Sequence, residues 1–107
     1  MYNIIIKQVS FSWDISKNKD NIIKHNVSFE EASSVFVDNN SRLFYDPRHS
    51  ENEDRYIILG LSDKGRLLVV SHCYRNNVIR IISARKATKN EQKEYKYEKY
   101  RKLKINR

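Results

Sequence analysis

The sequence predicts an α+β fold, in which two N-terminal helices and one C-terminal helix accompany a small antiparallel sheet of about four strands. Three observations lead to this prediction. Apolar residues recur at helical spacing near the N-terminus, three β-branched segments follow in the middle, and a capping motif opens a Lys-rich helical segment near the C-terminus. Because 107 residues is a usual length for one domain, we expect residues 1–107 to form a single domain.

The N-terminal helices are predicted from their capping residues. The letters FSW indicate a short strand, after which Asp14 or Ser16 can cap a helix through ISKNKDNIIKH. Asn26 can end this helix because asparagine tolerates the left-handed backbone conformation. Ser28 and Glu31 then have the spacing of a capping box, which opens a second helix. The apolar residues of this second helix fall on one face: Phe29, Ala32, Val35 and Phe36.

The sheet is predicted from three segments rich in β-branched residues, RYIILGLS, RLLVVSHCYR and VIRIISARK, which follow a short strand in SRLFYD. Pro47 and the polar run PRHSENED indicate a surface loop before the three segments. The short turn sequences DKGR and NN between them predict an antiparallel meander. Thr88 and Glu91 repeat the capping-box spacing and open the last helix, through KNEQKEYKYEKYRKL.

The two-residue turn at Asn76 and Asn77 predicts the register of the last two strands, because it would set Arg75 opposite Val78. Continued along both strands, this pairing divides the side chains between two faces. One face would carry Arg75, Cys73, Ser71, Val69 and Leu67 beside Val78, Arg80, Ile82, Ala84 and Lys86. The other would carry Tyr74, His72, Val70, Leu68 and Arg66 beside Ile79, Ile81, Ser83 and Arg85. A register slip of one residue would change this assignment.

The charge of the chain favours an anionic partner. Its 21 Lys and Arg residues exceed its 13 Asp and Glu residues, which gives a formal net charge of +8. Such an excess favours nucleic acid or an acidic protein, and the alternative is a merely soluble basic surface. Cys73 is the only cysteine, so no intrachain disulfide can form and a reducing, cytoplasmic location is expected. No segment has the length and composition of a membrane span or a secretory signal.

Cations in an otherwise apolar strand raise the question of function. Arg80, Arg85 and Lys86 occupy a strand that would be apolar if it were simply buried. Their side chains can reach solvent or pair with carboxylates from elsewhere in the fold, or they can face phosphate.

The last helix poses a similar choice. Tyr97, Tyr100 and Leu103 recur at helical spacing, so we expect them to pack against the core. We expect the lysines of this helix, Lys93 among them, to follow an RNA backbone, because a core contact and a basic outer face can coexist.

Two long segments, FSWDISKNKDNIIKHNVSFEEASSVF and RYIILGLSDKGRLLVVSHCYRNNVIRIISARKATKNEQKEY, carry a resemblance to a known family. The most specific parts are WD at positions 13 and 14, NIIKH followed by FEEA, and RIISARK. On these motifs, which span nearly the whole chain in this order, it resembles the BrnT toxin family. The sequence departs from the family pattern at Asn26, where the family usually has glycine, and in a longer basic tail after Tyr95.

This resemblance implies a ribonuclease toxin of a type II toxin–antitoxin system, with a fold similar to RelE toxins, that inhibits translation and growth. It implies a BrnA-type antitoxin as the partner. We expect an antitoxin dimer to carry two toxins as a heterotetramer and to contact operator DNA while the toxin touches little of it. No cofactor is expected, and no metal site either, because the three histidines lack the spacing of zinc ligands.

Metal-free RNA cleavage requires a base for the 2′-hydroxyl, an acid for the leaving 5′-oxygen and cations for the charge that builds on phosphorus. The predicted catalytic residues are Arg75, Arg80 and Arg85, whose planar forks match phosphate oxygens, together with His72 as acid or base. The predicted RNA contacts are Lys24, Tyr74, Lys86 and Lys93. A lone histidine in such a strand is more often a satisfied structural residue, which is the alternative interpretation of His72. The rival function is a non-catalytic nucleic-acid-binding domain that uses the same basic surface.

Overall fold

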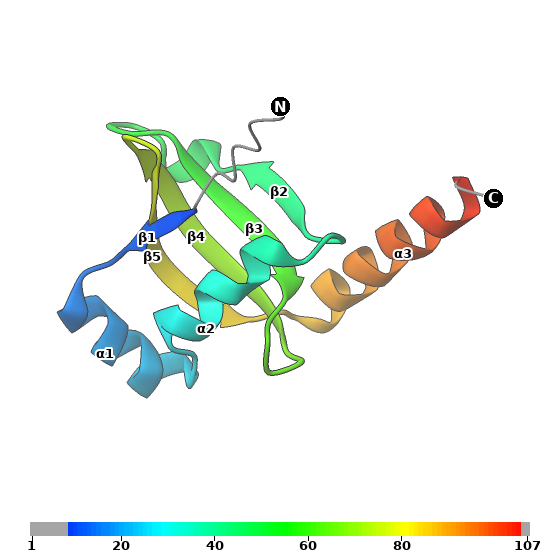
Figure 1. The fold of residues 1–107 in the computed structure, drawn as a ribbon, viewed down its shortest axis with the longest axis horizontal. Helices are drawn as coiled ribbons and strands as arrows, with labels where there is room; N and C mark the ends of the chain where they lie inside the picture. The colour runs from blue at the N-terminus through cyan, green and yellow to red at the C-terminus, as the bar shows by residue number, and fades with distance from the viewer. Residues whose placement is uncertain (1–8, 106–107) are drawn as a thin grey trace, which may run out of the picture.

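The computed structural model describes residues 9–105, and within them the predicted α+β class is confirmed (Figure 1). The elements are β1 (Ser10–Ser12), α1 (Ile15–His25), α2 (Phe29–Ser33), η1 (Ser34–Val37), β2 (Arg42–Tyr45), η2 (Pro47–His49), β3 (Arg55–Leu61), β4 (Leu67–Arg75), β5 (Val78–Lys86) and α3 (Lys89–Ile105). The apolar run at residues 4–6 lies outside the described residues. Of the helices in the described range, none combines the length and the apolar character that a membrane crossing requires.

The strands form one mixed sheet in the order β1-β5-β4-β3-β2. β3 to β5 are the antiparallel meander that the short turns predict, and β2 extends it by pairing antiparallel with β3. β1 pairs in parallel with β5, with Ser12 opposite Arg80. The prediction of about four antiparallel strands is therefore wrong in two respects, because the sheet has five strands and one pair is parallel. Turn sequences identify only neighbours that are consecutive in the chain, whereas a parallel neighbour is reached through a long crossover.

The predicted helix caps are confirmed at each helix. Asp14 caps α1 by accepting a hydrogen bond from the backbone three residues later, at 2.9 Å, and Asn26 ends this helix in the left-handed conformation with φ 56°. The Ser28 hydroxyl caps α2 in the same way, at 3.0 Å. Thr88 and Glu91 form a reciprocal capping box at α3, with bonds of 2.8 and 3.2 Å. These contacts span three residues, which is why the sequence alone predicts them.

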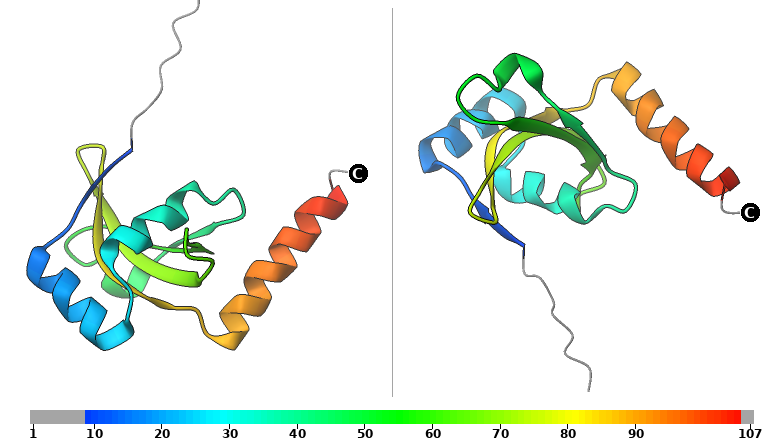
Figure 2. Two further views of the ribbon diagram at one scale, coloured as in Figure 1. Left: turned by 60° about the horizontal axis from the view of Figure 1, so that its bottom comes forward. Right: turned by 90° about the horizontal axis from the view of Figure 1, so that it is seen from above.

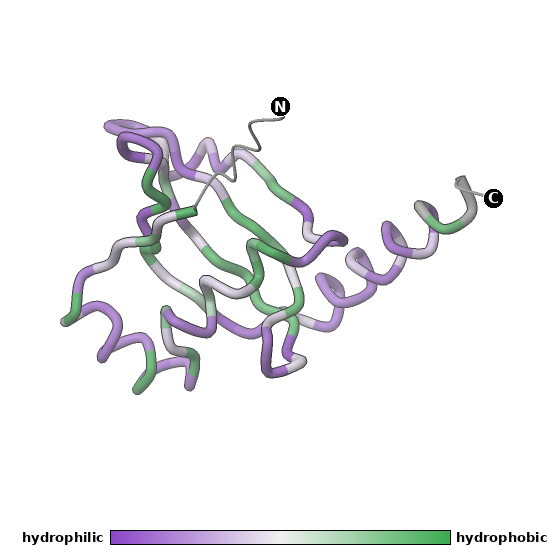
Figure 3. The backbone as a smooth tube through the Cα atoms, in the orientation of Figure 1, coloured by the Kyte–Doolittle hydropathy of each residue, from purple (hydrophilic) through white to green (hydrophobic). Residues whose placement is uncertain are grey.

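The two faces of the sheet are covered to different extents. α2 and η1 pack on one face, which we call the helix-covered face, and α1 packs against β5 (Figure 2). The buried core of the helix-covered face comprises Val27, Phe29, Ala32, Val35, Ile58, Leu68, Val70, Ile81 and Ala84. Figure 3 shows the hydrophobic residues gathered in the strands and a mostly hydrophilic α3. The buried Asn21 ties α1 to β5, because its amide donates to the carbonyl oxygens of Val27 and Ala84 at 2.8 Å.

The opposite face, which we call the open face, is packed at one end only. There Tyr95 of α3 lies against Leu59 and Val69. α3 then extends away from the sheet (Figures 1 and 2). The prediction that Tyr97, Tyr100 and Leu103 pack against the core is therefore wrong, since these side chains are exposed. Only the first turns of α3 have sheet beneath them, so Tyr95 is the tyrosine that becomes buried.

The hairpin turn between β4 and β5 has the predicted register. Arg75 lies opposite Val78, and two residues further Cys73 lies opposite Arg80. The two asparagines of the turn have φ values of 50° and 68°. Positive φ at both central residues is the backbone that a two-residue hairpin favours, and asparagine adopts it more readily than most residues.

A β-bulge beyond this point changes which side chains share a face. The register shifts between positions 71 and 72, so that Ser71 lies opposite Ser83 and Val69 opposite Arg85. The predicted pairing past the shift is wrong as a result. Ala84 belongs to the core of the helix-covered face. Arg85 lies on the open face, together with Arg75 and Arg80, which are nearer the turn. One extra residue in a strand inverts the alternation of every later side chain.

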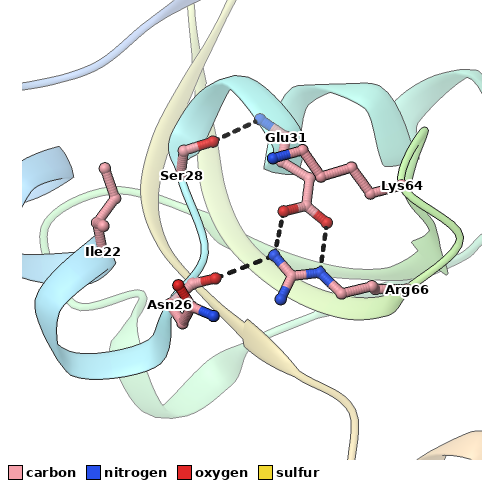
Figure 4. Close-up of a pocket in the computed structure, with 6 residues that line it drawn as sticks. All are labelled: Ile22, Asn26, Ser28, Glu31, Lys64 and Arg66. Carbon is pink, nitrogen blue, oxygen red and sulfur yellow. Dashed lines mark hydrogen bonds and ion pairs between the residues drawn. The ribbon is translucent and has the colours of Figure 1, made fainter.

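A buried ion pair fixes α2 to the turn before β4 (Figure 4). The Glu31 carboxylate accepts hydrogen bonds from the Arg66 guanidinium, through Nε at 2.9 Å and through Nη2, and from the Ser62 hydroxyl at 2.7 Å. Arg66 also donates to the Asn26 carbonyl oxygen at 3.0 Å. The side chain of Glu31 is 1% exposed, yet the bonds from Arg66 lower the pKa of its carboxyl group.

Replacement of Glu31 by glutamine should lower the free energy of unfolding at pH 7 by about 2–3 kcal/mol, because Arg66 loses its charged partner but, at 28% exposure, can regain some water. Urea denaturation measures this change, and the exposed neighbour Glu30→Gln is the matched control. The contribution of Glu31 is complete above its unfolded-state pKa and is lost as the pH falls through its lowered folded-state pKa, so the difference should shrink in acid. Equal stabilities at pH 7 would contradict this role.

Candidate functional site

Five arginines of the described chain lie on the open face. Strand register places Arg42 opposite Leu59, Arg85 opposite Val69, and both Arg55 and Arg80 beside Cys73 on its two sides. Arg75 follows Cys73 by two residues on β4 and therefore points the same way. Neighbouring strands are about 4.8 Å apart, so these long side chains can reach common ligands. The open face is thus a cationic surface.

α3 supplies carboxylates to two of these arginines. Arg42 Nη1 contacts Glu94 Oε2 at 2.7 Å, and both guanidinium ends of Arg85 contact Glu91, at 2.7 and 2.9 Å. The bonds from Arg85 lower the pKa of Glu91 to about 2. The buried Tyr95, which follows Glu94 on α3, donates its hydroxyl to Asp38 at 2.8 Å. Arg42 and Arg85 therefore attach α3 to the sheet.

A third arginine is held from the other end of the sheet. Glu53, in the loop before β3, contacts Arg75 with both carboxylate oxygens, at 2.8 and 3.0 Å. These bonds lower the pKa of Glu53 to about 2, so this group is a carboxylate at neutral pH. Burial raises the pKa of the neighbouring Cys73, which is therefore a neutral thiol. No carboxylate among the described residues lies within 4.0 Å of Arg55 or Arg80.

A cleft of about 270 Å³ opens beside the Glu53–Arg75 pair. It is lined by Arg48, His49, Glu51, Asn52, Glu53 and Arg55. His49 Nδ1 lies 2.9 Å from Asp46 Oδ2, and this contact orients an imidazole that is itself 64% exposed. The cleft thus combines a carboxylate and an oriented imidazole, which can transfer protons, with cations, which can stabilise charge on a phosphate ester. In the described range, no three His, Cys, Asp or Glu side chains are grouped so that they could hold a metal ion.

Sequence reasoning missed this cleft. The polar run PRHSENED indicates only a surface loop, because solvated loops commonly contain such residues. The signal that was present is a histidine and several acids immediately before Arg55 at the start of β3. That signal has meaning only once Glu53 is seen to reach Arg75, which lies 22 residues further along the chain.

The predicted site residues are divided between the two faces. Arg75, Arg80 and Arg85 share the open face, whereas His72 and Tyr74 lie on the opposite side of β4. His72 is fully buried, with Nδ1 3.1 Å from the Val70 carbonyl oxygen and Nε2 3.3 Å from the Tyr74 hydroxyl. Burial lowers the pKa of His72, which favours the neutral ring. Its environment is therefore that of a satisfied core histidine.

The predicted lysines lie around the margin of the molecule. Lys24 and Lys86 line a second cleft, at the junction of β5 and α3, together with Arg85. Lys93 is exposed on α3. These cations extend the positive surface away from the open face, toward the end at which α3 begins.

Comparison with known proteins relates the fold to a family. A family model described as "Ribonuclease toxin, BrnT, of type II toxin-antitoxin system" matches residues 13–91. The chain is also similar to the 1.1 Å crystal structure of the Brucella abortus ribonuclease toxin BrnT, with 19% sequence identity and a TM-score of 0.59, over 77% of this chain and 100% of that one. At this identity the structural likeness concerns the fold. No curated protein matches the chain.

Proposed function

We propose, given that this chain belongs to the BrnT family of ribonuclease toxins of type II toxin–antitoxin systems, that it cleaves RNA on the open face of its sheet. In this proposal the reaction needs no metal ion and its product fragments end in a 2′,3′-cyclic phosphate and a 5′-hydroxyl. Cleavage takes place in the cytoplasm, where it inhibits translation and growth.

The observation that carries this proposal is the pair Arg55 and Arg80. Both are half-buried on the open face, on the two sides of Cys73, and among residues 9–105 neither has a carboxylate within 4.0 Å, although the charge of Arg55 helps to lower the pKa of Glu53. Arg55 and Arg80 lie on β3 and β5, on either side of β4, so an anion above Cys73 would be attracted by both guanidinium groups. A phosphate group satisfies both, because its oxygens match the planar fork of arginine. The same groups would stabilise the charge that builds on phosphorus during cleavage.

We assign different parts to the predicted site residues on this basis. Arg75 and Arg80 contact the reacting phosphate, while Arg85 stays bound to Glu91 and shapes the far end of the surface. Lys24, Lys86 and Lys93 extend the path of the RNA backbone. In this assignment His72 has a structural role, because its ring is buried on the other face.

We propose further that a BrnA-type antitoxin neutralises the toxin by covering the open face. Acidic side chains of the antitoxin would occupy the positions that phosphate takes beside Arg55 and Arg80, since electrostatic complementarity suits such a surface. An antitoxin dimer would carry two toxins in a heterotetramer and leave its own DNA-binding part free for the operator.

Incubation of end-labelled RNA with the purified chain in excess EDTA should give cleavage at the rate seen without the chelator. The reason is that arginines take the place of a metal in stabilising charge, and a carboxylate and an imidazole are present for proton transfer. Binding without cleavage would instead support a non-catalytic nucleic-acid-binding domain. Loss of cleavage in EDTA, restored by Mg²⁺, would contradict metal independence.

A further inference from the structure

We infer that the segment at residues 46–54, between β2 and β3, supplies both proton-transfer groups of the reaction, with Glu53 as the general base and His49, positioned by Asp46, as the general acid. The inference rests on the proposed ribonuclease function and assigns its chemistry. Neither residue is among the arginines, lysines and mid-strand histidine to which the sequence points.

The position of Glu53 suits a base. Its carboxylate lines the cleft beside Arg55, and it also contacts Arg75 on the open face. Its side chain is 32% exposed, so a ribose hydroxyl can reach it. Cys73, the other titratable group beside it, stays a neutral thiol and does not compete for the proton. Glu53 therefore stands at the boundary between the cleft and the surface on which we place the phosphate.

The position of His49 suits an acid. When Nδ1–H is donated to Asp46, Nε2 is left to carry the proton that is transferred. Asp46 is itself fixed, because its side chain is 12% exposed and also accepts a hydrogen bond from the Arg48 backbone at 3.2 Å. The other charged groups that line the cleft are Arg48, Glu51, Glu53 and Arg55. Asp46 thus acts as a positioning residue, and the imidazole is the group that touches the substrate.

The reaction then balances without a co-reactant. Glu53 removes the proton of the ribose 2′-hydroxyl, and the 2′-oxygen forms a bond to phosphorus. The bond from phosphorus to the 5′-oxygen breaks, and protonated His49 gives its proton to that oxygen. Exchange with water returns Glu53 and His49 to their starting states. The negative charge on the phosphate oxygens is stabilised by Arg55, Arg75 and Arg80 throughout.

Arg75 links substrate binding to the strength of the base. In the free protein its fork is occupied by Glu53, which lowers the pKa of that carboxyl group. A bound phosphate competes for the same guanidinium donors. When Arg75 turns to the phosphate, Glu53 loses the contact that makes it a weak base. The carboxylate therefore becomes more basic only when RNA is present.

The experiment compares Glu53→Gln and His49→Ala on two RNA substrates, one ordinary and one with a sulfur atom in place of the bridging 5′-oxygen at the cleavage site. On ordinary RNA each variant should lose about 10²–10⁴-fold in kcat/KM. A thiolate leaves without a proton, so the sulfur substrate should restore His49→Ala and Asp46→Asn to near the wild-type rate. It should not restore Glu53→Gln, because the 2′-hydroxyl still needs a base.

The matched control is Asp54→Asn. Its carboxylate lies next to Glu53 in sequence but accepts a hydrogen bond from Tyr45, at 3.1 Å, away from the cleft. This variant should keep the wild-type rate on both substrates. Glu53→Asp, which keeps a carboxylate, should retain more activity than Glu53→Gln, and this ranking distinguishes loss of the base from loss of folding.

The outcomes separate this inference from the function on which it rests. An active wild type with an unaffected Glu53→Gln variant, or sulfur rescue of Glu53→Gln and not of His49→Ala, overturns the assignment alone. A wild type that binds both substrates and cleaves neither overturns the ribonuclease proposal and the assignment together. Rescue of His49→Ala and Asp46→Asn, without rescue of Glu53→Gln, establishes the assignment.

Discussion

Replacement of Arg80 by alanine is expected to lower kcat/KM for RNA cleavage by about 10²–10³-fold, as removal of one preorganised donor from a developing oxyanion does. Arg80 is half-buried on β5, between Ser12 on β1 and Cys73 on β4, and it lies on the same face of the sheet as Arg55. No ion pair among the described residues is lost with it. The free energy of unfolding should therefore change by no more than about 1 kcal/mol, which covers the packing of the side-chain stem.

Two further variants distinguish the effect of the Arg80 guanidinium group from the loss of one positive charge. Arg80→Lys keeps the charge but lacks the planar fork, so it should recover only part of the activity. Lys19→Ala removes one positive charge from an exposed position on α1 and should behave as the wild type. Activity is measured on labelled RNA, and stability by urea denaturation of the same preparations. Equal losses of stability and activity in Arg80→Ala would mark Arg80 as a structural residue instead.

Expression of the chain alone should arrest bacterial growth, and co-expression of the antitoxin encoded beside it should restore growth. This expectation follows from membership of a ribonuclease toxin family and from an open cationic face that cellular RNA can reach. Arg80→Ala is the matched control, because it should keep the fold and remove the predicted charge stabilisation. Cultures that express it at the same level should grow. Growth rate and mapped RNA ends are the measurements.

The antitoxin part of this result has its own signature. If acidic side chains cover the open face, the complex should form more slowly at high ionic strength, and purified antitoxin should protect RNA from cleavage. Normal growth despite verified expression of folded protein would count against the toxin function. RNA cleavage that continues in the saturated complex would show that the antitoxin acts elsewhere.

Several features of the fold follow from the sequence because their causes are local. The caps at Asp14, Ser28 and Thr88 each depend on a hydrogen bond to a backbone group three residues away. The turn at Asn76 and Asn77 sets the hairpin register over its first residues because both asparagines accept positive φ. The order of helices and strands, and the meander of β3 to β5, result from these signals and from hydrophobic periodicity.

The site depends on contacts between distant parts of the chain. The sequence places Arg75 and Arg80 on one face, through a turn of two residues. It does not reveal the bulge that brings Arg85 to that face, because a bulge is selected by the packing of Val70 and Ala84 against helices from the N-terminal part of the chain. The contacts that stabilise the bulge involve distant residues, so no short stretch of the sequence predicts it.

The same distinction applies to the proton-transfer groups. By its sequence, the run PRHSENED at residues 47–54 is a solvated loop, and His72 is the histidine that lies among apolar neighbours. Folding buries His72 on the helix-covered face and brings Glu53 to Arg75. The sequence by itself determined the elements, their caps and a cationic strand. Only the tertiary structure decided which charges meet. Glu53 and Arg75 are 22 residues apart in the chain, so their contact forms only when the strands of the sheet have paired.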